Sequence, residues 1–141
     1  MFQRILLAVD IDAAPRHTLD IVTDLARRFA GSVHVLHVVP TAMAAGDLVA
    51  VEGDEDAQRL LEEAVGALRA AGVPAEGELL GDLSTDVPSA VTAAAERMRA
   101  DLVVLSPHHH GAVAAWLNPS VSKAVTRAVH IPILLIRDAR K

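Results

Sequence analysis

The sequence predicts a single α/β domain over residues 1–141: a five-stranded, parallel, doubly wound sheet of strand order 3-2-1-4-5 with helices on both faces. Three observations predict this class. Short runs of Val, Ile and Leu recur along the chain, as in strands buried on both faces. Amphipathic helical patterns separate these runs. The composition, 52% hydrophobic and 22% charged, suffices for one continuous core.

The elements follow in β-α order. The expected strands cover residues 5–9, 33–39, 75–80, 102–105 and 133–136, of which the third is the least apolar. The expected helices cover residues 18–29, 57–70, 87–98 and 120–129. Gly31, Gly72 and the pair Ala100-Asp101 stand where the first three helices are expected to end. Right-handed crossovers then give the strand order and place a topological switch point between the first and fourth strands.

Residues 41–56 interrupt this alternation with a segment rich in Ala, Gly and acidic side chains. We expect a mobile loop over the carboxyl edge of the sheet. A spacer without a function of its own is the alternative.

Composition excludes several classes of function. The chain has no cysteine, which rules out disulfides, thiolate metal sites and thiol nucleophiles. We expect no signal peptide at the start of the sequence, and no apolar stretch approaches the roughly 20 residues of a membrane helix. A net charge of -5 and an aromatic content of 2% argue against nucleic-acid binding. We therefore expect a cytoplasmic protein that binds neither membrane nor nucleic acid.

The switch point defines a crevice bounded by Asp10 and Ser106, where open α/β sheets bind their ligands. The chain continues there as Ser-Pro-His-His-His-Gly over residues 106–111 and Trp-Leu-Asn-Pro-Ser over residues 116–120. A phosphate-binding loop usually carries glycines at such a place. The fold is therefore easier to predict than the ligand.

Several motifs resemble the universal stress protein family. They are Ile-Leu-Leu-Ala-Val-Asp over residues 5–10, Gly-Asp-Leu over 81–83, Ala-Asp-Leu-Val-Val-Leu over 100–105, and Ser-Val-Ser-Lys-Ala-Val followed by Ile-Pro-Ile-Leu-Leu-Ile over 120–136. The resemblance implies a fold like that of the adenine nucleotide alpha hydrolases, and a homodimer. It also implies, for one branch of the family, ATP bound by a pattern of Gly, two residues, Gly, nine residues, Gly and Ser or Thr.

Aligned on Ser120, this pattern puts Ser106, His109 and Pro119 at the three glycine positions. Glycine gives such a loop positive φ angles and lets backbone amides approach phosphate oxygens. A histidine obstructs that approach, and Pro119 lacks the amide donor, although it suits a first helical residue after an Asn118 cap. The loop is thus degenerate as a phosphate site.

A helix start at this point still offers an anion some donors. They are the amides of Ser120 and Val121, the hydroxyls of Ser120 and Ser122, and the positive end of the helix dipole. ATP or AMP therefore stays possible as a ligand. The expected binding positions around the crevice are Asp10, Asp12, Val39, Ser106, His108, His109, Gly111, Pro119, Ser120, Val121 and Ser122.

The opposite wall carries two carboxylates. By the resemblance, Asp10 contacts the adenosine part of a nucleotide; alternatively it accepts amides of its own turn. Asp12 replaces a small hydroxyl residue of the family, and at short range it would repel a triphosphate by about 1 kcal/mol. Val39 lines an adenine-sized slot or belongs to the core.

The three consecutive histidines, His108, His109 and His110, admit three interpretations. Imidazole is a common ligand of zinc, nickel and copper, but no further ligands follow at a suitable spacing, so we assign no metal site. Exposure on a loop is the simplest interpretation. In the third, a protonated His108 or His109 replaces the lost amides as an anion partner. His34 and His37, three residues apart on one strand, are expected to point to opposite faces of the sheet.

No nucleophile, base and orienting group can be assembled from the sequence, and Ser106 lacks the small neighbours of a nucleophile elbow, so we assign no catalytic residue. The segment from Ile131 to Ile136 is too apolar for a bare sheet edge and is expected to pair with its copy in a homodimer. The sequence thus favours a non-enzymatic, dimeric regulatory module. An ATP- or AMP-binding protein, possibly a slow ATPase, and a metal binder built on the histidines are the alternatives.

Overall fold

The computed structural model describes residues 1–9, 16–38, 41–44, 47–50, 54–80, 87–106, 127 and 129–136. The main sheet consists of β1 (Arg4–Val9), β2 (Ser32–Val38), β5 (Ala75–Leu80), β6 (Leu102–Ser106) and β7 (Ile133–Leu135). The helices whose bounds lie within the described residues are α1 (Arg16–Phe29), α2 (Asp54–Ala70) and α3 (Val87–Met98). The predicted helix over residues 120–129 lies outside the described residues, apart from 127 and 129.

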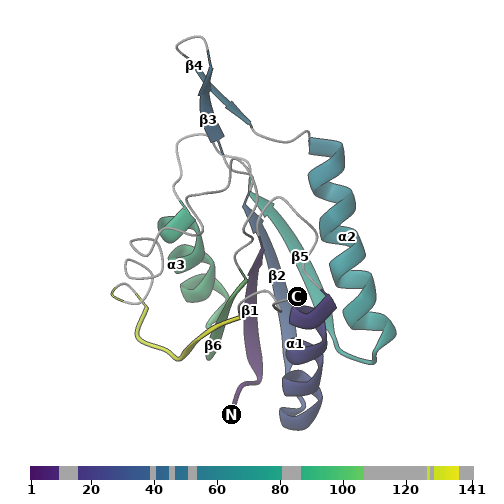
Figure 1. The fold of residues 1–141 in the computed structure, drawn as a ribbon. Coiled ribbons are helices and arrows are strands. Elements are labelled where there is room, and N and C mark those ends of the chain that lie inside the picture. Colours follow the sequence, from purple (N-terminus) through teal and green to yellow (C-terminus); the bar gives the residue numbers. More distant parts are fainter. Residues whose placement is uncertain are drawn as a thin grey trace.

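The five strands are parallel and lie in the order β5-β2-β1-β6-β7. Counted along the chain within this sheet, that order is 3-2-1-4-5, so the predicted fold class is confirmed. Helices α1 and α2 lie on one side of the sheet and α3 lies on the other (Figure 1). This arrangement follows from right-handed crossovers that run first in one direction along the sheet and then in the other.

Each face of the sheet has its own core. On the face of α1 and α2, Leu7 and Val35 pack with Val22 and Leu68. On the face of α3, Leu6 and Leu36 pack with Val91. Because β1 is central, its residues from Ile5 to Ala8 are completely buried. Their uniformly apolar sequence is therefore the direct result of two covered faces.

The helices end as predicted, but glycine has a different role from the one expected at the first end. The residues with positive φ at the three helix ends are Ala30, Gly72 and Arg99. Gly31 instead packs directly against the backbone carbonyl of Phe2, where a Cβ atom would collide with that oxygen. Helix α1 is thus followed by an alanine in the left-handed region, at a cost of roughly 1–2 kcal/mol, and the glycine is required by close packing against Phe2 and Gln3, which precede β1.

The prediction for residues 41–56 was wrong in part. Strands β3 (Thr41–Ala44) and β4 (Asp47–Ala50) form an antiparallel hairpin, and α2 already begins at Asp54. The hairpin projects beyond the carboxyl edge of the main sheet (Figure 1). Only residues 45 and 46 separate its strands, and two-residue connections that contain glycine are a strong hairpin signal. The alanine-rich composition concealed that signal.

Candidate functional site

The topological switch point lies between β1 and β6. Helix crossovers leave β1 toward β2 on one face and reach β6 from β5 on the other, so the sheet opens at the carboxyl ends of these two strands. Val9, the last residue of β1, is the register partner of Ser106, the last residue of β6. The structure therefore places Ser106 beside the strand that leads to Asp10, as the sequence predicted.

The residues just below the carboxyl edge of the sheet at the switch point are buried. Val9 and Leu105 are 3% and 2% exposed, and His37 at the end of β2 is completely buried. The backbone amide of Ile136 donates to the carbonyl of Leu105 at 2.9 Å, which holds the last strand against β6. A ligand at the switch point would therefore lie above buried residues that are closed to solvent.

Of the predicted binding positions, Ser106 is the one that the structure describes. The others lie outside the described residues; they are Asp10, Asp12, Val39, His108, His109, Gly111, Pro119, Ser120, Val121 and Ser122. The strands thus give the position of the switch point, and the crevice above it stays a prediction. The roles of these side chains stay predictions.

His34 and His37 occupy opposite faces of β2, as predicted. His34 shares the α3 face with Leu36, whereas the alternate residues Val33 and Val35 face α1 and α2. The Nε2 atom of His34 lies 3.4 Å from Oε1 of Glu78 on β5. His34 is thus part of a polar contact on the surface of the sheet rather than a ligand of the crevice.

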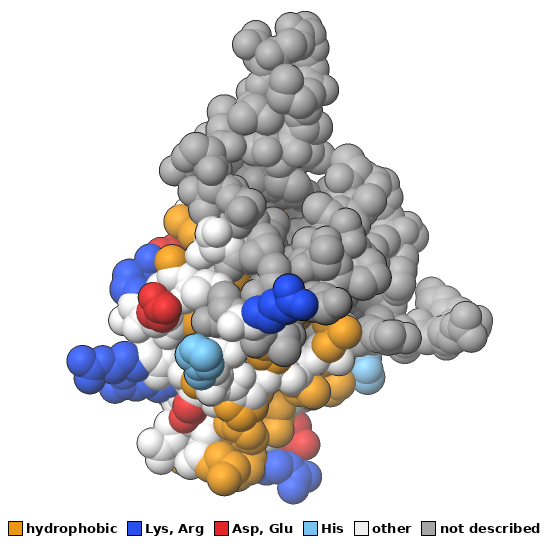
Figure 2. Space-filling view, turned by 90° about the vertical axis from the view of Figure 1, so that its left-hand side faces the viewer, with side chains coloured by type: hydrophobic (Ala, Val, Ile, Leu, Met, Phe, Trp, Pro, Cys, Tyr) orange, Lys and Arg blue, Asp and Glu red, His pale blue; other side chains and the backbone are white. Residues whose placement is uncertain are grey.

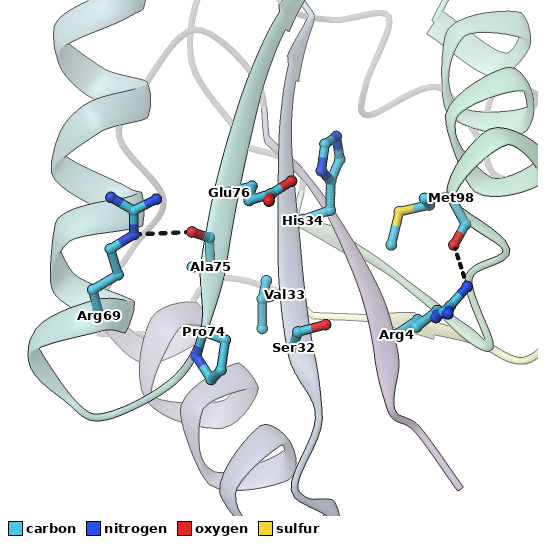
Figure 3. Close-up of a pocket in the computed structure, with 9 residues that line it drawn as sticks. All are labelled: Arg4, Ser32, Val33, His34, Arg69, Pro74, Ala75, Glu76 and Met98. Carbon is cyan, nitrogen blue, oxygen red and sulfur yellow. Dashed lines mark hydrogen bonds between the residues drawn. The ribbon is translucent and has the colours of Figure 1, made fainter.

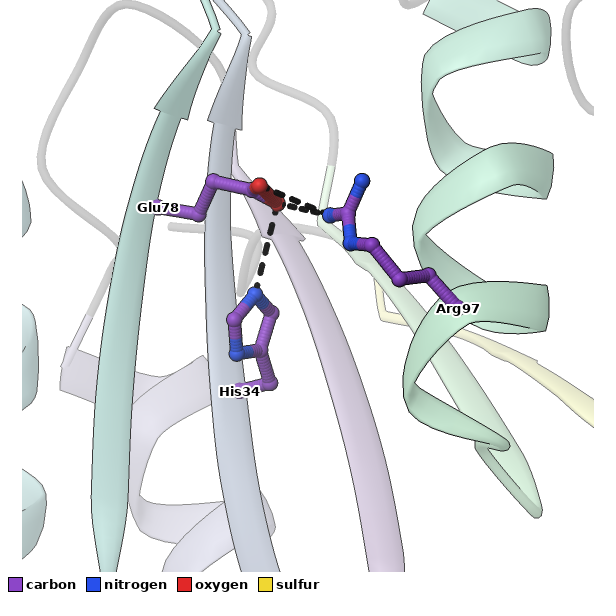
Figure 4. A network of polar contacts seen from close by, with 3 residues as sticks. All are labelled: His34, Glu78 and Arg97. Carbon is purple, nitrogen blue, oxygen red and sulfur yellow. Dashed lines mark hydrogen bonds and ion pairs between the residues drawn. The ribbon is translucent and has the colours of Figure 1, made fainter.

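Glu78 connects three elements of the fold. Besides His34 on β2, it contacts Arg97 on α3, whose Nη2 atom donates to both carboxylate oxygens, with Oε2 at 2.7 Å (Figure 4). The side chain of Glu78 is 26% exposed and that of Arg97 is 55% exposed. This bidentate contact ties the edge strand β5 to α3.

The sequence interpretation missed this network and a hollow next to it. The sequence did contain an indication of a polar face, because Glu76 and Glu78 stand two residues apart on an expected strand and must share one face of it. Their partners could not be read from the sequence, since His34 and Arg97 become neighbours only when β2, β5 and α3 are assembled. Among the described residues, no cluster of His, Asp and Glu could hold a metal ion.

Comparison with known proteins places the chain in a family. The profile of the universal stress protein family matches residues 1–137. No curated protein sequence matches the chain. No helix among the described residues is long and apolar enough to cross a membrane.

Three solved structures illustrate the likeness. A universal stress protein family member from Burkholderia pseudomallei is 23% identical, with 96% of each chain covered and a TM-score of 0.70. One from Archaeoglobus fulgidus, in complex with dAMP, is 25% identical, with 96% of this chain and 99% of that chain covered and a TM-score of 0.68. One from Arabidopsis thaliana, with AMP bound, is 16% identical, with 97% and 92% covered and a TM-score of 0.62. With the fold, the switch point and the match over nearly its whole length in agreement, the chain belongs to the universal stress protein family.

Proposed function

We propose that this protein is a non-enzymatic, homodimeric regulatory module of the cytoplasm, in which the phosphate-binding loop of the family has degenerated. The observation that carries the proposal is the pairing of Val9 with Ser106 at the switch point. It supports a position for Ser106 at the mouth of the crevice, where the ATP-binding pattern requires glycine. His109 and Pro119 replace the other two glycines.

The absence of an enzymatic activity is part of the proposal. Hydrolysis of ATP needs the triphosphate to be held and an attacking water to be positioned. A loop with Pro119 and His109 offers fewer backbone donors for the first task. Asp12, if it faces the crevice as the sequence predicts, adds a negative charge that opposes the second and third phosphates.

The dimer is supported by the edge formed by β7. Leu135 on this edge is 42% exposed, and Ile133 and Leu134 are half-buried. Seen from the side of α3, apolar side chains make up part of the described surface (Figure 2). An apolar edge strand of this kind is stabilised when it pairs with another strand. A two-fold axis would let one copy of β7 cover the other.

A second candidate function is the binding of an adenine mononucleotide. The structures from A. fulgidus and A. thaliana contain dAMP and AMP, respectively, and share this fold. A mononucleotide carries a single phosphate group, which one helix N-terminus near Ser120 could neutralise without a glycine-rich loop. Asp10 is then the residue that holds the adenosine part.

Titration calorimetry with AMP and with ATP and magnesium, together with an ATP hydrolysis assay, tests both candidates. No heat with either nucleotide and no turnover supports the module without a ligand in the crevice. Saturable binding of AMP that is lost in Asp10→Ala supports the mononucleotide site. Asp24→Ala, which changes an exposed aspartate on α1, is the control and should leave binding unchanged. ATP turnover abolished by Asp10→Ala would overturn the non-enzymatic proposal.

A further inference from the structure

A hollow of about 420 Å³ lies at the amino-terminal edge of the sheet, opposite the nucleotide crevice. Arg4, the first residue of β1, and Ser32, the first residue of β2, lie at its lower end (Figure 3). Glu76 of β5 and Met98, the last residue of α3, line its sides. Its volume falls in the range of small-molecule sites. Neither the family motifs nor the proposed function involves this place.

The hollow carries opposite charges on its two sides. The guanidinium of Arg4 stands on the side of α3, where its Nη1 atom donates to the carbonyl oxygen of Met98 at 3.4 Å. The carboxylate of Glu76 stands on the other side and points across β2 (Figure 3). Within the described part of the chain, neither Arg4 nor Glu76 belongs to an ion pair. Arg69 of α2 also lines the hollow, and its Nε atom donates to the carbonyl of Ala75 at 2.9 Å. Arg4 and Glu76 thus face one small space without neutralising each other.

The neighbouring network explains why Glu76 has no such partner. Glu76 and His34 are register partners on adjacent strands, so their side chains share one face of the sheet. The imidazole of His34 is nevertheless directed to Glu78, which also binds Arg97. The two nearby groups that could pair with Glu76 are therefore already engaged with the next carboxylate along β5.

One apolar side chain faces the space between the two charges. The thioether of Met98 points into the hollow (Figure 3). Val33 also borders the hollow, but its side chain packs in the core on the face of α1 and α2. A ligand that fits must offer apolar atoms to Met98 as well as charge to both sides.

We propose that the hollow binds a small zwitterion with an aliphatic side chain, of the chemical class of free α-amino acids. Its carboxylate pairs with the guanidinium of Arg4 and its ammonium group with the carboxylate of Glu76. A simple anion is repelled by Glu76, and a simple cation is repelled by Arg4. Both charged residues reach solvent, so the binding is weak and responds to metabolite concentration.

The test uses L-leucine and two analogues that each lack one charge, 4-methylpentanoate and 3-methylbutylamine. Amide chemical shifts of the isotope-labelled protein are followed during titration. L-leucine should give saturable shifts around Ser32, His34 and Glu76, and each analogue should bind about tenfold more weakly or worse, since each loses one charge-assisted contact. Equal binding of the three compounds, or no saturable shift with L-leucine, would overturn the proposal.

Variants separate the site from a general surface effect. Glu76→Gln and Arg4→Gln should each weaken L-leucine binding about tenfold. The carboxylate of Asp101 accepts a hydrogen bond from the backbone amide of Arg4, and this contact does not involve the Arg4 side chain. The variant Arg4→Gln should therefore still fold, which a thermal melt verifies. Arg28→Gln, a change of an exposed arginine on α1, is the matched control and should leave the affinity unchanged. Insensitivity to Glu76→Gln, the milder variant, contradicts the inference even if Arg4→Gln fails to fold.

Discussion

The two edges of the main sheet are built from opposite kinds of residue. At one edge, β5 carries Glu76 and Glu78 on either side of Gly77, and Nε of Arg69 donates to the outer carbonyl of Ala75 at 2.9 Å. At the other edge, β7 consists of Ile133, Leu134 and Leu135. Charged side chains and a covered carbonyl discourage pairing with a further strand, whereas an apolar edge favours it.

The difference has a consequence for assembly. A sheet with two apolar edges could add copies at both ends and grow without closing. A sheet with one protected edge forms a closed dimer through the other. The charges on β5 therefore complement the proposed pairing of β7, because they would limit the proposed assembly to two copies.

The largest expected effect comes from Leu135→Asp. The change places a charge in the proposed dimer contact, so the dimer dissociation constant should rise by a factor of about 30 or more, corresponding to roughly 2 kcal/mol. Sedimentation velocity over a concentration series measures it. Because Leu135 is 42% exposed in the single chain, the monomer should keep its fold. An unchanged dimer would show that β7 is not the contact.

The second prediction concerns the packing of the charged edge strand β5 against α2. A Cβ atom at Gly77 would lie 2.9 Å from Cγ2 of Val65 and 3.0 Å from two carbon atoms of Leu61, both on α2. Gly77→Ala should therefore lower the free energy of unfolding by about 1–3 kcal/mol, measured by urea denaturation. The control is Gly66→Ala on the exposed side of α2, where a Cβ would meet no atom within 4 Å.

The control should change stability in the opposite direction. In the interior of a helix, alanine is more favourable than glycine by about 0.8–1.0 kcal/mol. Gly66→Ala should thus stabilise the protein. Equal effects of Gly77→Ala and Gly66→Ala would mean that β5 is held less tightly under α2 than the structure indicates.

The smallest expected effect concerns the tie between β5 and α3. Arg97→Gln removes the bidentate contact with Glu78 and should lower the free energy of unfolding by up to about 1 kcal/mol, because Arg97 is 55% exposed and the pair is partly screened. Arg28→Gln removes a pair with Asp24 that is 71% and 64% exposed, and should cost only about 0.3–0.5 kcal/mol. If both variants lower the free energy of unfolding equally, the network on β5 stabilises the protein no more than a surface ion pair does.

The elements of the fold were largely predictable from the sequence. The buried strands β1 and β6 are apolar apart from Arg4 at the start of β1 and Ser106 at the end of β6, and α3 follows the predicted span 87–98. The hairpin β3–β4 was not predicted, since alanine gives little periodicity in either state. The role of Gly31 was also misjudged, because a close approach to Phe2 across the chain leaves no local signal.

The candidate site was predictable in position and not in detail. The strand order alone gave the switch point, and the pairing of Val9 with Ser106 agrees with it. The hollow beside Arg4 and Glu76 could not be predicted in the same way. It depends on which residues of β1, β5 and α3 stand opposite each other, and those residues are far apart in the chain.

By itself, the sequence determined the family, the strand order and the loss of the glycine pattern, because periodicity and motif spacing are local properties that short-range physics encodes. Only the tertiary structure decided which polar groups meet. Register and helix docking brought Glu78 to His34 and Arg97, and left Glu76 facing Arg4 across an open hollow. The reason is that a side chain's partners are chosen by the packing of the whole core, in which one residue's shift along a strand would turn every side chain to the other face.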